Sequence, residues 1–249
     1  MQIPLVSMPL LARVYDIAFG SFGKNDLSFV SEVLQRLPEG LHVDLGCANG
    51  RALEPALRQG RKVFGIDYSH DMTEMAKKRF AAAYPRQAHF ETGDFRTTNL
   101  PDKVALFSCL LNTWFMIPSI SDRIALLRRC KEHLVTGGIV LIINVNNPTG
   151  DPSYYGFEKF VEGIGNVKFD VDWQQGVTIE SILQRRGKMT ISIDGEEESH
   201  QLNNVLLTPS QFEAEVRDSG LRVFQKFGSF SKQSLDALNS EWQIYVLEN

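Results

Sequence analysis

A regular alternation between short apolar runs and longer amphipathic stretches, from Leu41 to Val145, most limits how this chain folds. The apolar runs are rich in β-branched residues, which is typical of buried strands. Because a strand, a helix and a further strand are joined by a right-handed crossover, this order predicts a mostly parallel sheet with helices on both faces. The expected strands are residues 41–45, 62–66, 89–92, 104–109 and 139–145, and the expected helices are residues 51–59, 70–84 and 121–135, the last stopped by Gly137 and Gly138.

The pattern changes after Asn147, where several prolines and glycines interrupt it. Alternating runs at residues 168–173, 177–184, 188–193 and 199–207 then predict antiparallel strands, with Asp194-Gly195 as a hairpin turn. A helix from Pro209 to Ser219 and strands at 221–228 and 242–247 resume the first pattern.

The sequence therefore predicts an α/β fold with a doubly wound, seven-stranded Rossmann-like sheet and an inserted small antiparallel β lid. All 249 residues are expected to form a single domain. Within it, residues 1–40 are expected to form an N-terminal helical cap, and residues 152–207 the inserted lid on the acceptor side.

The overall charge and the cysteine content exclude several classes of function. A formal net charge of -4 argues against a surface built to bind nucleic acid. Cys47, Cys109 and Cys130 are widely spaced without a metal-binding pattern, so no metal site is expected and a reducing cytoplasmic location is favoured. No apolar stretch reaches the roughly 20 residues of a membrane span, so no membrane association is expected. The oligomeric state stays open.

The first strand ends in a turn of small residues, Asp44-Leu45-Gly46-Cys47-Ala48-Asn49-Gly50, that leads directly into a helix. In an open α/β sheet, ligands bind at the carboxyl ends of the strands, and this turn borders that edge. The second strand ends at Asp67, whose carboxylate can accept hydrogen bonds from ribose hydroxyls. Since the turn lacks the Gly-x-Gly-x-x-Gly pattern of a pyrophosphate site, the sequence indicates a nucleoside ligand. Each feature alone has an alternative explanation. The turn could need glycine only for packing between strand and helix, and Asp67 could serve only as a helix N-cap.

These residues resemble the first two motifs of the class I S-adenosylmethionine-dependent methyltransferases. The likeness continues in Gly93-Asp94-Phe95, which resembles the family's adenine site, and in the Gly137-Gly138 turn. Two residues depart from the family pattern: Ala48 stands where glycine is more common, and Ala105 where many members have an acidic residue. The cofactor-binding residues that the resemblance implies are Tyr15, Asp44, Gly46, Cys47, Ala48, Gly50, Asp67, Tyr68, Met72, Asp94, Phe95, Cys109 and Leu110.

The function implied by this resemblance is transfer of a methyl group from S-adenosylmethionine to a nitrogen or oxygen of a small-molecule metabolite. A protein or RNA methyltransferase is one alternative, and a non-catalytic protein that binds the S-adenosyl nucleoside is another. The net charge disfavours RNA as the acceptor.

Two residues are candidates for catalysis. Tyr15 resembles an N-terminal tyrosine that closes over the cofactor in several small-molecule methyltransferases, although it also fits an apolar helix face. His200, near the end of the inserted strands, is the candidate general base because histidine titrates near neutral pH; the alternative is that it only occupies a polar strand position. The aromatic residues of the insertion either line an acceptor pocket as a lid or form the small sheet's own core.

Overall fold

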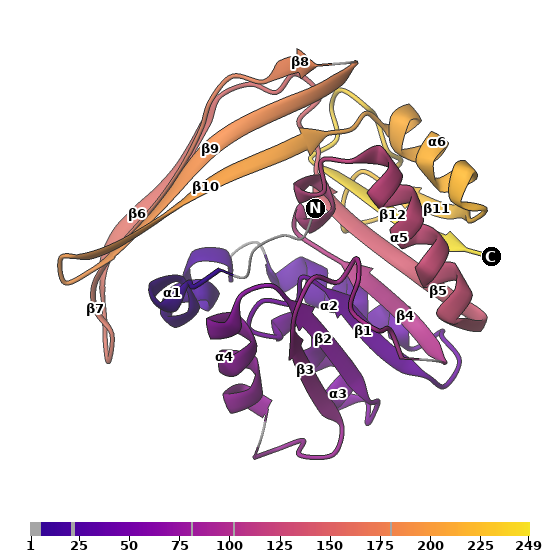
Figure 1. The fold of residues 1–249 in the computed structure, drawn as a ribbon, viewed down its shortest axis with the longest axis horizontal. Coiled ribbons are helices and arrows are strands. Elements are labelled where there is room, and N and C mark those ends of the chain that lie inside the picture. The colour runs from indigo at the N-terminus through magenta and orange to yellow at the C-terminus, as the bar shows by residue number, and fades with distance from the viewer. Residues whose placement is uncertain (1–5, 21–22, 81, 102, 180) are drawn as a thin grey trace.

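A seven-stranded sheet forms the centre of the molecule (Figure 1). The computed structural model describes residues 6–20, 23–80, 82–101, 103–179 and 181–249. Strands β1 to β5 are parallel, and β12 is antiparallel to both β5 and β11. The strand order is β11-β12-β5-β4-β1-β2-β3, so the order reverses between β1 and β4. The strands are β1 (Leu41–Leu45), β2 (Val63–Asp67), β3 (Ala88–Thr92), β4 (Val104–Cys109), β5 (Leu134–Val145), β11 (Arg222–Phe227) and β12 (Trp242–Glu248). The predicted doubly wound sheet is confirmed.

Helices cover both faces of this sheet, because alternate residues of each buried strand point to opposite sides. Leu106 of β4 packs with α2, α3 and α4, whereas its neighbour Phe107 packs with α5 and α6. The helices of the described residues are α1 (Pro9–Phe19), α2 (Gly23–Leu34), α3 (Glu54–Arg58), α4 (His70–Phe80), α5 (Ile120–His133) and α6 (Pro209–Ser219), with short 3-10 turns η1 (Arg51–Leu53) and η2 (Thr113–Met116). None of them is long and apolar enough to cross a membrane.

The prediction that Gly137 and Gly138 stop the helix expected at residues 121–135 is wrong. Helix α5 ends at His133, and β5 begins at the next residue. The register against β4 jumps from Leu134 to Ile139, so the intervening residues bulge out of the ladder. Gly137 has a φ of +78°, which a side chain would strain, and this explains why glycine is found in the bulge.

A second sheet is inserted between β5 and α6, with the order β10-β9-β7-β6 and with β8 paired to β9. Its strands are β6 (Ser153–Val161), β7 (Gly165–Trp173), β8 (Val177–Ile179), β9 (Ile182–Ile193) and β10 (Glu196–Leu206). Strand β6 was not predicted. The run expected as one strand at 177–184 is instead divided between β8 and the start of β9, and the run 188–193 belongs to the same long strand β9. The hairpin turn at Asp194-Gly195 is confirmed, with positive φ at both residues.

The inserted sheet is held above the main domain by helix α1 (Figure 1). Alternate residues of β7, among them Phe169, are buried against α1 residues such as Val14 and Ala18. The Tyr155 hydroxyl also donates to the Ala18 carbonyl oxygen at 3.2 Å. In contrast, Phe160 is 71% exposed. The aromatic residues of the insertion are thus divided between a shared core with α1 and the outer surface.

Candidate functional site

The turn after β1 is a tight backbone structure docked on its neighbours. Gly46 and Gly50 have φ values of +81° and +77°, and Ala48 adopts a φ of +46°, a conformation that costs a non-glycine residue about 1 kcal/mol. A Cβ on Gly46 would lie 2.4 Å from Cγ2 of Thr113 in η2. The turn therefore needs glycine at this position, because η2 presses directly against it.

Asp67, at the end of β2, fixes this turn through its carboxylate. Its Oδ2 accepts from the Ala48 backbone nitrogen at 2.8 Å, and its Oδ1 accepts from the Ser69 nitrogen at 2.9 Å. The side chain is buried, and burial raises its pKa to about 6 despite these hydrogen bonds. Each oxygen has a second lone pair, so Asp67 is a fixed acceptor for hydroxyl groups of a ligand.

Asp44 lies at the end of a chain of three buried polar side chains. The Ser108 hydroxyl donates to Asp44 Oδ1 at 2.6 Å, and His42 Nε2 lies 2.7 Å from the same hydroxyl oxygen. Because a serine hydroxyl has one proton and gives it to Asp44, His42 Nε2 must carry a proton and donate. Burial raises the pKa of Asp44 to about 7 and lowers the pKa of His42 to about 3.

His42 and Ser108 were not predicted, although their positions carry a signal. His42 and Asp44 are two residues apart on β1, so both side chains project from one face of the strand. Ser108 is the partner of Asp44 in the parallel pairing of β1 with β4. The β1–β4 register is the missing information, since the sequence alone does not give it.

The buried side chains around the turn carry more negative than positive charge. Arg51 is the nearest buried cation, and its guanidinium forms a bidentate pair with Asp26 of α2 at 2.6 and 3.2 Å. Its charge is therefore largely matched, and Asp44 and Asp67 remain as two buried carboxylates with raised pKa values. A cationic nucleoside with free ribose hydroxyls fits this donor and acceptor set.

Helix α1 is attached to the turn by Asp16. Its Oδ1 accepts from Asn49 Nδ2 at 2.9 Å, and its Oδ2 pairs with Arg79 of α4 at 2.8 Å. Tyr15, the preceding residue, is half-buried and belongs to the same apolar cluster as Ala48. Burial raises the pKa of its hydroxyl, so the phenol stays protonated at neutral pH. The structure thus places Tyr15 beside the turn as a neutral hydroxyl.

Several other residues expected at the cofactor lie around the same turn. Tyr68 and Met72 share the cluster that contains Ala48 and Tyr15. The Cys47 sulfur packs on the backbone of Gly65, where an added Cβ would lie 2.8 Å away, and burial raises the pKa of its thiol. The structure therefore gathers these residues on the carboxyl side of β1 and β2.

The residues expected around the adenine are already engaged with the protein. Both carboxylate oxygens of Asp94 bind the guanidinium of Arg96, with the shortest contact at 2.6 Å. Phe95 and Cys109 are buried in the core cluster beneath α5 and α6, whereas Leu110 packs on the opposite face. The side chains of Asp94, Phe95 and Cys109 thus have structural contacts that the sequence did not reveal.

The three cysteines are free and buried. Within the described residues no three histidine, cysteine, aspartate or glutamate side chains are grouped as metal ligands. The described part of the chain therefore contains no metal centre built from these residue types.

His200 is paired with a carboxylate that also caps helix α1. His200 Nε2 lies 2.6 Å from Oε1 of Glu198, and Oε2 of Glu198 accepts from the Leu10 backbone nitrogen at 2.7 Å. An acidic side chain at a helix N-terminus is stabilised by the free backbone N–H groups and by the helix dipole. Glu198 was not predicted, because its contact with Leu10 joins residues 188 positions apart. It orients the imidazole and leaves Nδ1 as the atom that can take a proton.

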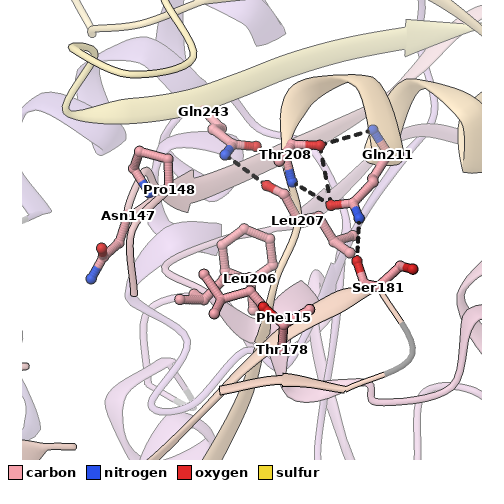
Figure 2. Close-up of a pocket in the computed structure, with 11 residues that line it drawn as sticks. Phe115, Asn147, Pro148, Thr178, Ser181, Leu206, Leu207, Thr208, Gln211 and Gln243 are labelled. Atoms are coloured by element: carbon pink, nitrogen blue, oxygen red, sulfur yellow. Dashed lines mark hydrogen bonds between the residues drawn. The ribbon is translucent and has the colours of Figure 1, made fainter. Parts of the chain in front are cut away.

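A pocket of about 220 Å³ lies beside η2, between the hairpin of β8 and β9 and the start of α6 (Figure 2). The hairpin is attached to α6 by Gln211, whose Nε2 donates to the Ser181 carbonyl oxygen at 2.8 Å. Phe115 of η2 lies in the wall of the pocket, and Thr113 of the same turn contacts Gly46. The Cα atoms of these two η2 residues are at most about 7.6 Å apart, so the pocket is close to the cofactor turn. The described residues around it are Phe115, Asn147, Pro148, Thr178, Ser181, Leu183, Leu206, Leu207, Thr208, Gln211 and Gln243.

Comparison with known proteins connects this site to a family. Residues 43–138 match the family described as "Methyltransferase domain". The chain is 25% identical over 232 residues to the dTDP-4-amino-2,3,4,6-tetradeoxy-D-glucose N,N-dimethyltransferase of Saccharopolyspora spinosa, a match that covers 88% of both chains. It is 24% identical over 211 residues to the cypemycin N-terminal methyltransferase of a Streptomyces species, covering 83% of this chain and 82% of the relative. The solved structure of the CcbJ methyltransferase from Streptomyces caelestis matches with a TM-score of 0.77 at 17% identity, over 96% of both chains.

Proposed function

We propose that this chain, a class I S-adenosylmethionine-dependent methyltransferase, methylates an amine nitrogen of a small-molecule acceptor that carries an amino sugar. One observation carries the proposal: the match to the amino-sugar N,N-dimethyltransferase covers 88% of the chain. The part outside the match is shorter than the inserted sheet, so the likeness includes elements on the acceptor side. The second relative is named as an N-terminal methyltransferase, and an amino terminus is again an amine.

The cofactor supplies an activated methyl group on a sulfonium, and its binding is assigned to the turn after β1. We assign the ribose hydroxyls to Asp67 and the ammonium of the methionine part to Asp44, the two unbalanced carboxylates. The backbone from Gly46 to Gly50 borders the methionine part, and Tyr68 and Met72 border the adenine. Since Asp94 holds Arg96, we expect the adenine to be bound mainly by backbone groups at this end.

The chemical step needs an unprotonated amine in line with the methyl group and the sulfur. The nitrogen lone pair forms the new N–C bond while the S–C bond electrons return to sulfur, and the methylated nitrogen then loses one proton. We assign this proton to Nδ1 of His200, held by Glu198. Tyr15 stays protonated, so its part is to wall the site and donate a hydrogen bond, not to act as a base.

We also propose where the acceptor enters, in which compartment the protein works and which partners it does not bind. The acceptor enters from the side of the pocket in Figure 2, where no charged side chain lines the wall among the described residues. Three free, buried cysteines fit a reducing cytoplasm. The net charge of -4 makes nucleic acid an unsuitable partner.

A methyl-transfer assay with labelled cofactor tests the proposal. The acceptor panel contains amino deoxysugars, as methyl glycosides and as nucleotide-linked sugars, together with a peptide with a free amino terminus. We expect labelled product from at least one amino sugar, with a mass gain of one or two methyl groups. Asp67→Ala should abolish binding of S-adenosylhomocysteine, whereas Asp218→Ala, an exposed substitution on α6, should leave it within twofold.

Two results would contradict the proposal. Product from the peptide but from no amino sugar would move the acceptor to the peptide class. Tight cofactor binding without product from any amine would favour a non-catalytic binding protein.

A further inference from the structure

Arg185 of β9 is a buried cation with no carboxylate to balance it among the described residues. Only 7% of the residue is exposed. Its Nη1 donates to the Asp151 carbonyl oxygen at 3.1 Å and to the Ser153 hydroxyl at 3.3 Å, and its guanidinium lies 4.2 Å from the centre of the Trp173 ring. These contacts hold the side chain in one orientation but supply no negative charge.

The other two buried arginines of the described chain show what is missing. Arg51 is paired with Asp26 at 2.6 Å, and Arg123 is paired with Glu215 at 2.5 Å. Arg185 alone of the three lacks such a partner, and burial lowers the pKa of its guanidinium. An uncompensated buried charge is strongly unfavourable, and this protein avoids it at the two other sites.

The free donors of Arg185 are those that bind oxyanions. Within the described residues neither Nε nor Nη2 donates a hydrogen bond, and Nε is buried without a partner. The Nε–Nη2 edge of a guanidinium matches the two oxygens of a carboxylate or phosphoryl group. Stacking on Trp173 orients this edge in advance, which reduces the entropy lost on binding.

Arg185 also lies next to the pocket on the acceptor side. Leu183, two residues earlier on the same face of β9, lines that pocket, and so does its partner Leu206 on β10. Two residues along a strand span about 7 Å. The pocket offers uncharged side chains (Figure 2), so Arg185 is the adjacent positive charge.

We propose that Arg185 binds an anionic oxygen group of the acceptor, a phosphoryl or a carboxylate, while an uncharged part of the same molecule occupies the neighbouring pocket. The inference rests on the proposed function only in taking the ligand to be the methyl acceptor. A nucleotide-linked sugar carries the phosphoryl form of this group, and a sugar acid carries the carboxylate form.

Thermal-shift titrations with inorganic pyrophosphate and with acetate test Arg185 without any methyl transfer, with sodium chloride at the same ionic strength as reference. We expect at least one of the two anions to raise the unfolding temperature of the wild type in a saturable way. The anion with the lower apparent dissociation constant shows whether Arg185 prefers a phosphoryl group or a carboxylate. Arg185→Met should raise the apparent dissociation constant at least tenfold. Arg186→Met, the exposed neighbour on the opposite face, should leave it within twofold. Arg185→Lys keeps the charge but loses the paired donors of the guanidinium, so its apparent dissociation constant should lie between those of the two methionine variants. This variant replaces Arg185→Met if Arg185→Met does not fold.

The inference is overturned if neither anion stabilises the wild type beyond chloride, or if the Arg185 and Arg186 variants respond alike. This result is separate from failure of the proposed function. Methylation of a neutral amino glycoside without any anion effect would refute the role of Arg185 alone. Anion binding at Arg185 without methylation of any amine would refute the proposed function alone.

Discussion

Replacing Asp44 by asparagine should make the cofactor-free protein more stable at alkaline pH while weakening cofactor binding. Asparagine keeps an oxygen that accepts from Ser108 but carries no charge. The wild-type carboxyl is buried, and its pKa is raised from 3.8 to about 7. The folded protein therefore favours the protonated carboxyl, so this contribution to stability is complete below pH 3.8 and is lost as the pH rises through about 7.

The magnitude follows from the size of that shift. At 1.36 kcal/mol per pKa unit, a shift of about three units corresponds to about 4 kcal/mol between the two pH limits. Most of it, roughly 2–3 kcal/mol, falls between pH 5 and pH 8. For a chain of this size 1 kcal/mol moves the unfolding midpoint by about 2–4 °C. The difference in unfolding midpoint between the variant and the wild type should therefore increase by about 5–10 °C from pH 5 to pH 8, in favour of the variant.

The surroundings of Asp44 determine the sign of this prediction. Desolvation is the main cause of the raised pKa, and Asp67 and Asp26 add to it. The hydrogen bond from Ser108 and the charge of Arg51 act in the opposite direction, but do not overcome burial. Other titratable groups nearby are neutral at these pH values, because Tyr15, Cys47 and Cys109 have raised pKa values and His42 has a lowered one. Removing the Asp44 charge also relieves repulsion with Asp67.

Two measurements check the Asp44 prediction. Calorimetric unfolding without cofactor at pH 5, 6.5 and 8 gives the difference between variant and wild type. Titration with S-adenosylhomocysteine should show about 100-fold weaker binding by the variant, because a buried charge pair that loses one partner costs about 3 kcal/mol or more. If the stability difference is the same at all three pH values, Asp44 does not carry the buried charge on which the reasoning depends.

Three further predictions address the neighbouring residues. Ser108→Ala removes a hydrogen bond that lowers the Asp44 pKa, so the pH midpoint of S-adenosylhomocysteine affinity should move above about 7 in calorimetry. Phe169→Ala should destabilise the protein by about 3–5 kcal/mol in urea unfolding, since this fully buried ring joins the inserted sheet to α1. Glu198→Gln should lower kcat about 10- to 100-fold in the methyl-transfer assay while the affinity for S-adenosylhomocysteine changes less than threefold, because the change disturbs the His200 pair and not the cofactor turn.

The sequence predicted those parts of the fold whose signals are local. Strand β4 at Val104–Cys109 was predicted at its observed limits, because a fully buried parallel strand is a continuous apolar run. The bulge at Gly137 was missed because a glycine pair after a helix has the same local pattern as a helix stop. Strand β6 was missed because it is largely exposed, so its side chains alternate only weakly between apolar and polar.

The local geometry of the candidate site was predictable where one turn determines it, but not where residues far apart in the sequence meet. The positions of Gly46, Gly50 and Asp67 follow from strand ends that the sequence marks. The contact from Glu198 to Leu10 joins residues 188 positions apart and depends on how the inserted sheet settles on α1. That none of the described carboxylates pairs with Arg185 likewise depends on the packing of the whole inserted sheet.

Among the described residues, the two ends of the proposed site carry opposite charges without an ion-pair partner, and this has a consequence for ligand binding. On our proposals, Asp44 and Asp67 favour a cation at the cofactor end, while Arg185 favours an anion at the acceptor end. A ligand that supplies the missing charge binds the folded protein and not the unfolded chain, so each ligand should stabilise the fold. Because the two ends present opposite charges, a molecule suited to one end is repelled from the other. The same arrangement therefore selects which ligand occupies which end of the site.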